Sequence, residues 1–443
     1  MPGDFKRWSY EKDMPSLDGK VIFLTGGTAG LGATTVERLA KKGPAHIYFS
    51  GRNADAASSV IRKCKAIAPS VEATFVKMDM SSLSSVSEAL SQTFKSSRLD
   101  ILICNAGIMA VPCGLSKDGY EIQFAVNFLA HAMIIQRLLP TMLQTAASPG
   151  GDVRIVLVTS VGWRAHPKNG VAFDTLRTVQ DFGMLGPWRR YGQSKVAAVL
   201  YAAELARRYP QLTSVSVHPG VVATGLVDTL SFKDRAFVYV GNLWHLDTAD
   251  EASLNAMWAA SSDRAKIKNG NWYLPVGIDG QQKLDADASN PDIARKLWEW
   301  AEDSIASSEA KDPGSIYHND NHQFRAVGHL RRKLQRHAHQ VSWIEVARPA
   351  DVSNLGACIG ALQRLHEQDL THGTPDPDIL LVKEGRVILI DFEEAESRLD
   401  ALARAKGMYN LMSSMLGRGP LYGLDDSSED EEAEQSERQG SDR

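Results

Sequence analysis

Short apolar runs alternate with longer stretches of helical spacing between residues 17 and about 305. This alternation constrains the fold more than any other feature, because strands linked by helices pair side by side in parallel. The seven runs are Val21–Thr25, His46–Ser50, Ala73–Met78, Ile101–Cys104, Arg154–Thr159, Ser214–Val217 and Trp272–Leu274. The sequence therefore predicts a parallel sheet covered by helices on both faces.

Seven strands connected through helices are typical of a doubly wound α/β sheet of the Rossmann type. Such sheets bind their ligands in a crevice at the carboxyl ends of the strands. The longest apolar stretch, Phe124–Leu139, is interrupted by Asn127, His131 and Arg137. It is shorter than the roughly 20 apolar residues that a membrane span needs, so we expect a buried helix and no membrane span.

The composition changes after Ile305, where a polar, histidine-bearing stretch begins. Apolar spacing resumes with an expected helix at 354–367 and an expected hairpin at 379–390. The end of the chain is rich in acidic residues and serine, a composition that cannot bury a core. The expected organisation is a Rossmann-type domain over 1–305, a polar linker over 306–341, a small α+β fragment over 342–416 and a disordered acidic tail over 417–443.

Composition and charge exclude several classes of function. The 49 lysines and arginines and 53 aspartates and glutamates leave a net charge of −4, which provides no basic field for nucleic acid. Four cysteines without a CxxC pair, and linker histidines without metal-ligand spacing, predict neither a disulfide framework nor a bound metal. Charged residues stand where a secretory signal would be apolar, so we expect a cytoplasmic protein.

A glycine-rich turn directly follows the first strand and precedes a helix that ends near Gly43. Glycines let the backbone approach a phosphate, and the helix N-terminus offers free N–H groups to it. Glycine used only for its conformation is the alternative, but the position between strand and helix favours dinucleotide binding. The candidate cofactor-binding residues of this turn are Thr25, Gly26, Thr28, Gly30, Leu31 and Gly32.

Arg52 follows the second strand at the position where NAD-binding sites carry an acidic residue. An arginine can instead pair with the 2′-phosphate that distinguishes NADP from NAD. We therefore expect NADP(H) as the cofactor. The alternative is that Arg52 is an ordinary solvent-exposed arginine.

Tyr191 and Lys195 stand four residues apart at the start of an expected helix that opens with Tyr191 and runs to Arg208. This spacing puts both side chains on one helix face, with the ammonium beside the phenol. A tyrosine titrates near pH 10, and acid–base work near neutrality requires a downward pKa shift of roughly three units. A neighbouring cation shifts the pKa in that direction, although such a pair on an exposed helix also occurs by chance.

Several motifs occur in one order along residues 17 to about 305. They are Thr25-Gly26-x-x-x-Gly30-x-Gly32, Cys104-Asn105-Ala106-Gly107, Asn127, Thr159-Ser160, Tyr191-x-x-x-Lys195 and Pro219-Gly220. In this combination the chain resembles the short-chain dehydrogenase/reductase family over about two thirds of its length. It is most similar to the subgroup of retinol-dehydrogenase-like and fungal secondary-metabolism reductases. Cys104 is a departure, because many relatives have asparagine there.

The resemblance implies four catalytic residues. Tyr191 would be the general acid and base, and Lys195 would lower the pKa of Tyr191 and hold the nicotinamide ribose. Ser160 would hydrogen-bond the carbonyl oxygen of the substrate, and Asn127 would support a water-linked proton path to Lys195. The enzyme would then be an NADP-dependent oxidoreductase that interconverts a ketone or aldehyde and an alcohol.

The resemblance also implies further cofactor contacts. Asp79 would contact the adenine, Asn105 and Gly107 would support the site at the central sheet, and the segment from Pro219 would hold the nicotinamide carboxamide through Thr224. Tyr191 and Lys195 would contact the cofactor as well.

Ser160 and Tyr191 are 31 residues apart, longer than in the shorter relatives. Apolar side chains fill this insertion and the segment after Gly220: Trp163, His166, Phe173, Phe182, Met184, Trp188, Phe232, Phe237, Tyr239 and Trp244. They predict an apolar lid and a hydrophobic small-molecule carbonyl or alcohol substrate. A satellite core beneath a long loop is the alternative. The insertion leaves the choice between monomer and homodimer open.

The fragment 342–416 resembles part of a degenerate protein-kinase-like fold. The resemblance rests on His372-Gly373-Thr374-Pro375-Asp376 and Leu389-Ile390-Asp391-Phe392-Glu393. Thr374 stands where the family's catalytic aspartate belongs, so we expect no kinase activity. Two rivals to the oxidoreductase therefore stay open: a phosphotransferase, which Thr374 argues against, and a noncatalytic dinucleotide sensor or scaffold with a pseudokinase-like appendage.

Overall fold

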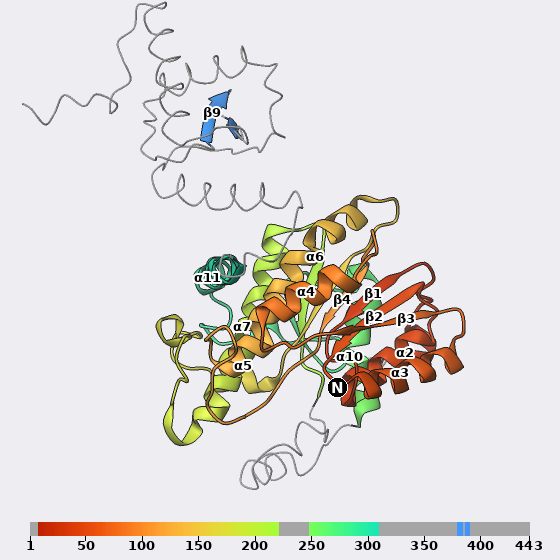
Figure 1. Ribbon diagram of the computed structural model, residues 1–443, viewed down its shortest axis with the longest axis horizontal. Coiled ribbons are helices and arrows are strands. Elements are labelled where there is room, and N and C mark those ends of the chain that lie inside the picture. The colour runs from red at the N-terminus through yellow and green to blue at the C-terminus, as the bar shows by residue number, and fades with distance from the viewer. Residues whose placement is uncertain (1–7, 221–247, 310–378, 384–385, 390–443) are drawn as a thin grey trace, which may run out of the picture. The chain divides into compact units, whose positions relative to one another are not determined.

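A computed structural model describes residues 8–220, 248–309, 379–383 and 386–389 of the chain (Figure 1). The chain divides into two units, Met1–Ile316 and Tyr317–Arg443, which are described separately. In the second unit, strands β9 (Ile379–Lys383) and β10 (Arg386–Leu389) pair antiparallel, so the expected hairpin is confirmed. The other features expected after residue 309 lie outside the described residues: the rest of the fragment 342–416, the helix at 354–367, the linker and the acidic tail.

The first unit is built on one eight-stranded sheet with the order β3-β2-β1-β4-β5-β6-β7-β8 among the described residues. Its strands are β1 (Val21–Leu24), β2 (His46–Gly51), β3 (Glu72–Lys77), β4 (Ile101–Cys104), β5 (Arg154–Val158), β6 (Thr213–Val217), β7 (Trp272–Leu274) and β8 (Ile278–Asp279). The first seven run parallel, and each matches a predicted run to within one residue at either end. The doubly wound fold is therefore confirmed.

The expected number of seven strands was wrong by one. β8 is only two residues long and pairs antiparallel with β7 through Leu274 and Ile278. The chain reverses at Gly277, whose φ of +70° favours glycine. A two-residue strand is too short to show an alternating pattern in the sequence.

The strand order explains where a ligand can bind. β1 pairs with β2 on one side and with β4 on the other. The connection from β1 therefore leads to one side of β1, and the connection from β3 to β4 leads back to the other side. Strands β1, β4, β5 and β6 are buried along their whole length, as strands of a parallel sheet covered on both faces must be. The crevice of such a sheet lies at the carboxyl ends of β1 and β4, where the direction changes.

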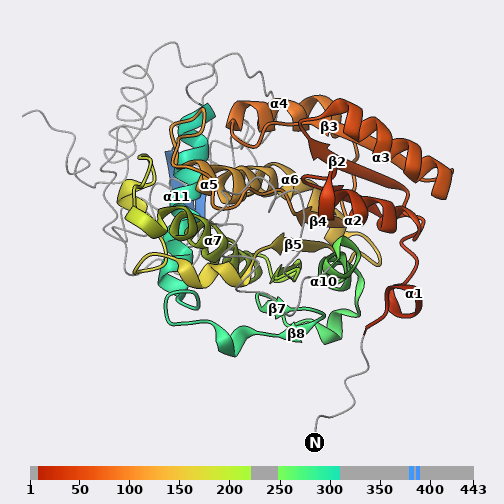
Figure 2. The ribbon, with the colours of Figure 1, turned by 90° about the horizontal axis from the view of Figure 1, so that it is seen from below.

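Helices cover both faces of the sheet (Figures 1 and 2). The helices and short helical turns are α1 (Tyr10–Asp13), α2 (Gly30–Ala40), α3 (Ala54–Ile67), α4 (Leu83–Thr93), α5 (Ile122–Phe124), η1 (Ala125–Leu129), α6 (Ala130–Ala147), η2 (Val161–Ala165), η3 (Phe173–Thr175), η4 (Gly183–Leu185), α7 (Gly186–Arg208), α10 (Ala249–Ser261), η5 (Arg264–Lys266), η6 (Gln281–Lys283) and α11 (Pro291–Glu309). Helices α2, α3 and α10 pack on one apolar core, and α4, α6, α7 and α11 pack on the other.

The expected buried helix is continuous from Ile122 to Ala147 and contains one π-helical turn, η1. By length and composition alone this helix could cross a membrane, but 78% of its most apolar window is buried inside the protein. A core helix has this property. Its Arg137 pairs with Glu309, the last residue of α11. Helix α11 therefore continues beyond residue 305, where we expected the Rossmann-type domain to end.

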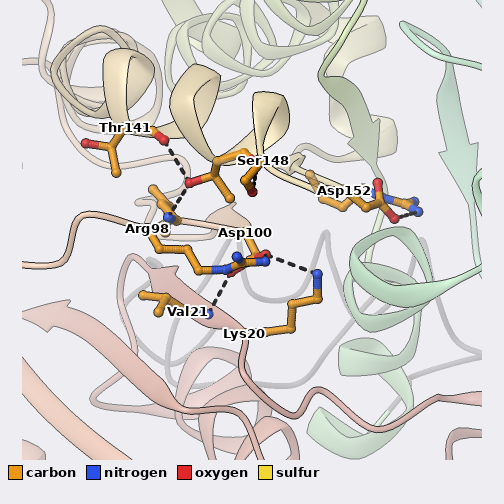
Figure 3. A network of polar contacts seen from close by, with 10 residues as sticks. Lys20, Val21, Arg98, Asp100, Thr141, Ser148 and Asp152 are labelled. Atoms are coloured by element: carbon orange, nitrogen blue, oxygen red, sulfur yellow. Dashed lines mark hydrogen bonds and ion pairs between the residues drawn. The ribbon is translucent and has the colours of Figure 1, made fainter. Parts of the chain in front are cut away.

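The amino ends of the central strands carry a network of paired charges (Figure 3). Asp100 is fully buried before β4 and accepts two hydrogen bonds from Arg98, at 2.6 and 2.7 Å. It also accepts one bond from Lys20 and one from the backbone N–H of Val21. These bonds hold the pKa of Asp100 below its usual value although burial alone would raise it. At this edge the buried carboxylate is fully satisfied.

Candidate active site

The glycine turn after β1 is shaped by close backbone approach. Gly26 has φ +72°, and a Cβ atom there would lie 2.9 Å from the Cα atom of Ala106. A Cβ atom on Gly32 would lie 2.0 Å from the carbonyl oxygen of Gly26. Helix α2 begins at Gly30 with Leu31 in its first turn, and no side chain caps its N-terminus. The turn is therefore a cradle that side chains would fill, which fits a dinucleotide pyrophosphate.

Thr25 connects this turn to the end of β4. Its side-chain oxygen accepts hydrogen bonds from the backbone N–H groups of Asn105 and Ala106, at 2.8 and 2.9 Å. The Asn105 amide in turn donates to the Thr25 carbonyl oxygen at 2.9 Å. The two strand ends that border the crevice are thus tied by three hydrogen bonds.

Thr28 and Arg52 lie at the end of β2. A Cβ atom on Gly51 would lie 2.5 Å from the Cγ2 atom of Thr28, so the turn packs directly on the residue before Arg52. Arg52 is exposed, and within the described part of the chain its side chain has no hydrogen bond or ion pair. Its position agrees both with a phosphate partner and with the alternative of an ordinary surface arginine.

Asp79 lies just beyond β3 with its carboxylate already bonded. It accepts from the backbone and hydroxyl of Ser81, and it forms an ion pair with Lys117 at 2.9 Å. Burial would raise its pKa, but the bonds from Lys117 and Ser81 lower the pKa of Asp79 to about 2. The expected adenine contact therefore involves a carboxylate that is ionised and held in place.

Tyr191 is buried on α7 beside Ser160, which follows β5. Helix α7 begins at Gly186, so Tyr191 lies in its second turn and not at its start. A Cβ atom on Gly162 would lie 2.9 Å from the Cε1 atom of the Tyr191 ring and 3.3 Å from the Ser160 hydroxyl oxygen. Gly162 thereby gives the phenol ring its place next to Ser160.

Lys195 lies one turn further along α7 and is also buried. Its Nζ atom donates to the Val158 carbonyl oxygen at 3.1 Å and lies 5.6 Å from the centroid of the Tyr191 ring. Among the described residues no carboxylate pairs with this ammonium, so burial lowers the pKa of Lys195 to about 8. A Cβ atom on Gly107 would lie 3.5 Å from Nζ, which places Gly107 at the site as well.

The expected lowering of the Tyr191 pKa was wrong for the chain alone. Burial raises the pKa of Tyr191 to about 12, and the hydrogen bond with Ser160 opposes this only in part. Because the ring is removed from water, the charged phenolate loses more stabilisation than one neighbour restores. Tyr191 is therefore a protonated acid at neutral pH.

Asn127 lies in the π-helical turn, and its side-chain amide is fully engaged. Its oxygen accepts from the Ile108 N–H at 2.8 Å, and its nitrogen donates to the Ile108 carbonyl and to the Ser194 hydroxyl, both at 2.9 Å. The side chain makes no hydrogen bond to Lys195 within the described residues. π-helical turns are frequent at functional sites, where they reposition a single residue.

The insertion before Tyr191 contains aromatic residues of both expected kinds, some in a satellite core and one beside Tyr191. Trp163 is buried and packs edge-on against Trp272, as a satellite core would. Trp188 instead packs against Ala110, as Met109 also does, and lies edge-on to Tyr191, with the ring centroids 6.4 Å apart. The insertion thus supplies core on one side and an apolar neighbour of Tyr191 on the other.

Most other parts of the expected lid and carboxamide site fall in the segment 221–247, outside the described residues. Pro219 follows β6, directly after the buried His218. Thr224, Phe232, Phe237, Tyr239 and Trp244 lie outside the described residues.

Two groups next to the site were missed from the sequence. Arg190, beside Tyr191, is buried against Glu121 at 3.4 Å and donates to backbone carbonyls of Gln180 and Val111. His131 lies between Asn127 and Thr25. The only signal for His131 was a polar residue four positions after Asn127 in an apolar run, because its partners meet it only in the folded chain.

Comparisons with known proteins agree with this geometry. A family model described as short chain dehydrogenase matches residues 20–174. The short-chain dehydrogenase/reductase drtF of Aspergillus calidoustus is 33% identical over 315 residues, which cover 68% of this chain and 98% of that protein. Retinol dehydrogenase 11 of Homo sapiens is 30% identical over 287 residues, which cover 64% of this chain and 85% of that protein.

The fold is also similar to a solved structure. An uncharacterised protein of Mycobacterium paratuberculosis superposes with a TM-score of 0.52 at 27% identity, covering 68% of this chain and 98% of that one. The similarity to the drtF protein extends over nearly the whole length of that relative. The chain therefore belongs to the short-chain dehydrogenase/reductase family.

Proposed function

We propose that this protein is an NADP(H)-dependent reductase of ketones or aldehydes on hydrophobic small molecules. The observation that carries the proposal is the buried Tyr191 beside Ser160, next to a lysine that lacks a carboxylate partner among the described residues. A phenol with its proton in place can donate that proton to a carbonyl oxygen, as reduction requires.

The residues at the carboxyl edge divide the work. The glycine turn would hold the pyrophosphate, and the Lys195 ammonium, which has donors left after its bond to Val158, would hold the nicotinamide ribose. When bound, the dinucleotide supplies the hydride. Ser160 would donate to the substrate carbonyl oxygen and orient it, and Tyr191 would deliver the proton to that same oxygen.

Arg52 supports NADP(H) over NAD(H). It follows β2 in contact range of the turn through Gly51 and Thr28, it is exposed, and its guanidinium has no protein partner among the described residues. An unpaired guanidinium at this position suits a 2′-phosphate, because the two groups form charge-assisted hydrogen bonds. No acidic residue follows β2 directly to accept from a free ribose, since Asn53 caps α3 instead.

An apolar substrate is supported by the surroundings of Tyr191. Trp188, Met109 and Ala110 form an apolar cluster on the side of Tyr191 that the insertion borders. Such a wall favours substrates that bury hydrocarbon surface near the reacting carbonyl. A cytoplasmic location and a role in secondary metabolism stay predictions.

The rival is a noncatalytic dinucleotide sensor. A sensor needs the glycine turn and Arg52 but has no use for a buried acid at the substrate side. The placement of the Tyr191 ring by Gly162 beside Ser160 therefore favours an enzyme.

The test is reduction of a panel of apolar ketones and aldehydes with NADPH, followed at the absorbance of the reduced nicotinamide. Tyr191→Phe should lower kcat by about 10² to 10⁴, the usual contribution of a general acid, while NADPH binding stays within a few-fold. Tyr201→Phe is the matched control, because Tyr201 is a buried tyrosine of the same helix that stacks on Trp298 away from the site. NADPH binding without turnover on any substrate would favour the sensor, and equal turnover in Tyr191→Phe would refute the assigned acid.

A further inference from the structure

A single histidine bridges the cofactor side and the catalytic side of the site. His131 is 3% exposed and lies on α6, one turn after Asn127. Its Nε2 atom is 2.8 Å from the Thr25 hydroxyl oxygen, and its Nδ1 atom is 2.9 Å from the backbone carbonyl oxygen of Asn127. Neither bond belongs to the regular helix or to the sheet.

The hydrogen-bond inventory determines where the protons are. A carbonyl oxygen only accepts, so Nδ1 of His131 must carry the proton in the bond to Asn127. The ring is neutral, because burial lowers the pKa of His131 to about 4, and Nε2 is then an acceptor. The Thr25 hydroxyl must therefore donate to Nε2.

The donors and acceptors of the Thr25 hydroxyl can be assigned in the same way. A hydroxyl has one proton and two lone pairs. At Thr25 the lone pairs accept from the N–H groups of Asn105 and Ala106, and the proton goes to His131. Every hydrogen-bonding position of this buried side chain is used, and only the neutral Nδ1–H form of His131 satisfies it.

Beyond Asn127, side-chain hydrogen bonds continue to the backbone of Tyr191. The Asn127 amide donates to the Ser194 hydroxyl, which donates to the backbone carbonyl of Tyr191 at 2.7 Å. Buried hydrogen bonds thus link Thr25 through His131 to the backbone of Asn127, and the Asn127 side chain through Ser194 to the backbone carbonyl of Tyr191.

We propose that His131 is a positioning residue that links the dinucleotide turn to the catalytic helix, holding Thr25 with one ring nitrogen and the Asn127 carbonyl with the other. The proposal rests on the proposed function only for its effect on turnover. Its two bonds act on different properties: the bond to Thr25 shapes the turn that holds the cofactor, and the bond to Asn127 orients the π-helical turn beside Lys195.

Two substitutions separate these bonds. His131→Asn can keep a donor near the Nδ1 position and loses the reach to Thr25, so NADPH affinity should fall about five- to tenfold with kcat within threefold. His131→Gln can keep an acceptor near the Nε2 position and loses the bond to Asn127, so kcat should fall about five- to tenfold with NADPH affinity within threefold. His131→Leu should show both losses.

Affinity is measured by tryptophan fluorescence titration with NADPH, and each variant's Tm is recorded. His46→Gln is the control, because His46 bonds Thr74 at the opposite edge of the sheet and should change neither property. If Asn and Gln at position 131 reduce affinity and kcat in equal proportion, the proposed division between the two bonds is wrong. If His131→Leu retains both properties, the positioning role itself is wrong.

A second measurement does not need turnover. In ¹⁵N-histidine-labelled protein, the resonances that disappear in His131→Gln should report a neutral ring protonated at Nδ1 between pH 6 and 8. A ring protonated at Nε2, or at both nitrogens, would overturn the proposal. If the wild-type chain binds NADPH but reduces no carbonyl, the proposed function fails while the tautomer and the affinity loss of His131→Asn still decide the role of His131.

Discussion

The two edges of the central sheet use buried charge in opposite ways. At the amino edge, the buried Asp100 meets Arg98 and Lys20, and every charge has a partner (Figure 3). At the carboxyl edge, Lys195 is equally buried but donates only to a backbone carbonyl among the described residues. An ion pair offsets part of the free-energy cost of burying a charge. The fold does not offset this cost at Lys195, so a bound ligand can do so by accepting hydrogen bonds from the ammonium. The comparison separates a region that stabilises from a region that acts.

Replacing the lone ammonium should give the largest effect. In Lys195→Met we expect kcat/KM to fall by a factor of about 10² to 10³, because ribose contact and charge near Tyr191 are lost together. The free energy of unfolding should stay equal or rise, since a buried charge without a carboxylate is replaced by an apolar side chain of similar length. Steady-state kinetics and urea denaturation of one preparation test both statements, and a large loss of stability would show that Lys195 is paired after all.

The opposite edge should behave in the opposite way. Asp100→Asn removes a carboxylate that accepts from two cations, and we expect a loss of about 2 to 3 kcal/mol in unfolding free energy with kcat unchanged. Because the folded-state pKa of Asp100 is lowered, its contribution is present above the unfolded value of about 4 and is lost as the pH falls through the folded value. The difference from wild type should therefore shrink in acid.

Asp292→Asn serves as its control. Asp292 forms an exposed pair with Arg295, which we expect to contribute at most about 1 kcal/mol. A reduced kcat in folded Asp100→Asn would break the separation of the two edges.

Cofactor choice sharpens the description of the carboxyl edge. Arg52→Asp exchanges a phosphate partner for a group that repels phosphate and accepts from ribose hydroxyls, so the ratio of kcat/KM for NADPH over NADH should fall about tenfold or more. Arg62→Asp, an exposed arginine on α3, should leave the ratio unchanged. An unchanged ratio in Arg52→Asp would favour the surface-arginine alternative.

The smallest expected effect is a pH dependence of cofactor binding. Burial lowers the Lys195 pKa to about 8, so the ammonium is present below pH 8 and is lost as the pH rises above it. NADPH affinity of the free protein should therefore weaken a few-fold between pH 7 and 9. Fluorescence titrations over this range test it, with Lys195→Met as the variant in which the slope should disappear.

Most of the sheet could be predicted from the sequence, because its buried strands are short and largely apolar, although β6 also buries Thr213, Ser214 and Ser216. The turn and the Tyr191–Lys195 pair were also predictable, since glycines after a strand and an i, i+4 spacing are local signals. The pKa direction of Tyr191 was not, because it depends on how much water the insertion and η2 exclude. The bridging role of His131 was equally hidden, since Thr25 lies 106 residues away in the chain.

Two glycines of the site, Gly26 and Gly162, are restricted by different parts of the structure. Gly26 is constrained by its own backbone as well as by Ala106, so no other L-residue suits it. Gly162 has no such backbone constraint, and a methyl group there would be limited by side chains, with the ring of Tyr191 at 2.9 Å and the Ser160 hydroxyl oxygen at 3.3 Å. The residue at position 191 therefore determines which residue types fit at position 162. A library that varies positions 162 and 191 together should recover folded proteins with alanine at 162 and a smaller residue at 191, and none of them should reduce a carbonyl.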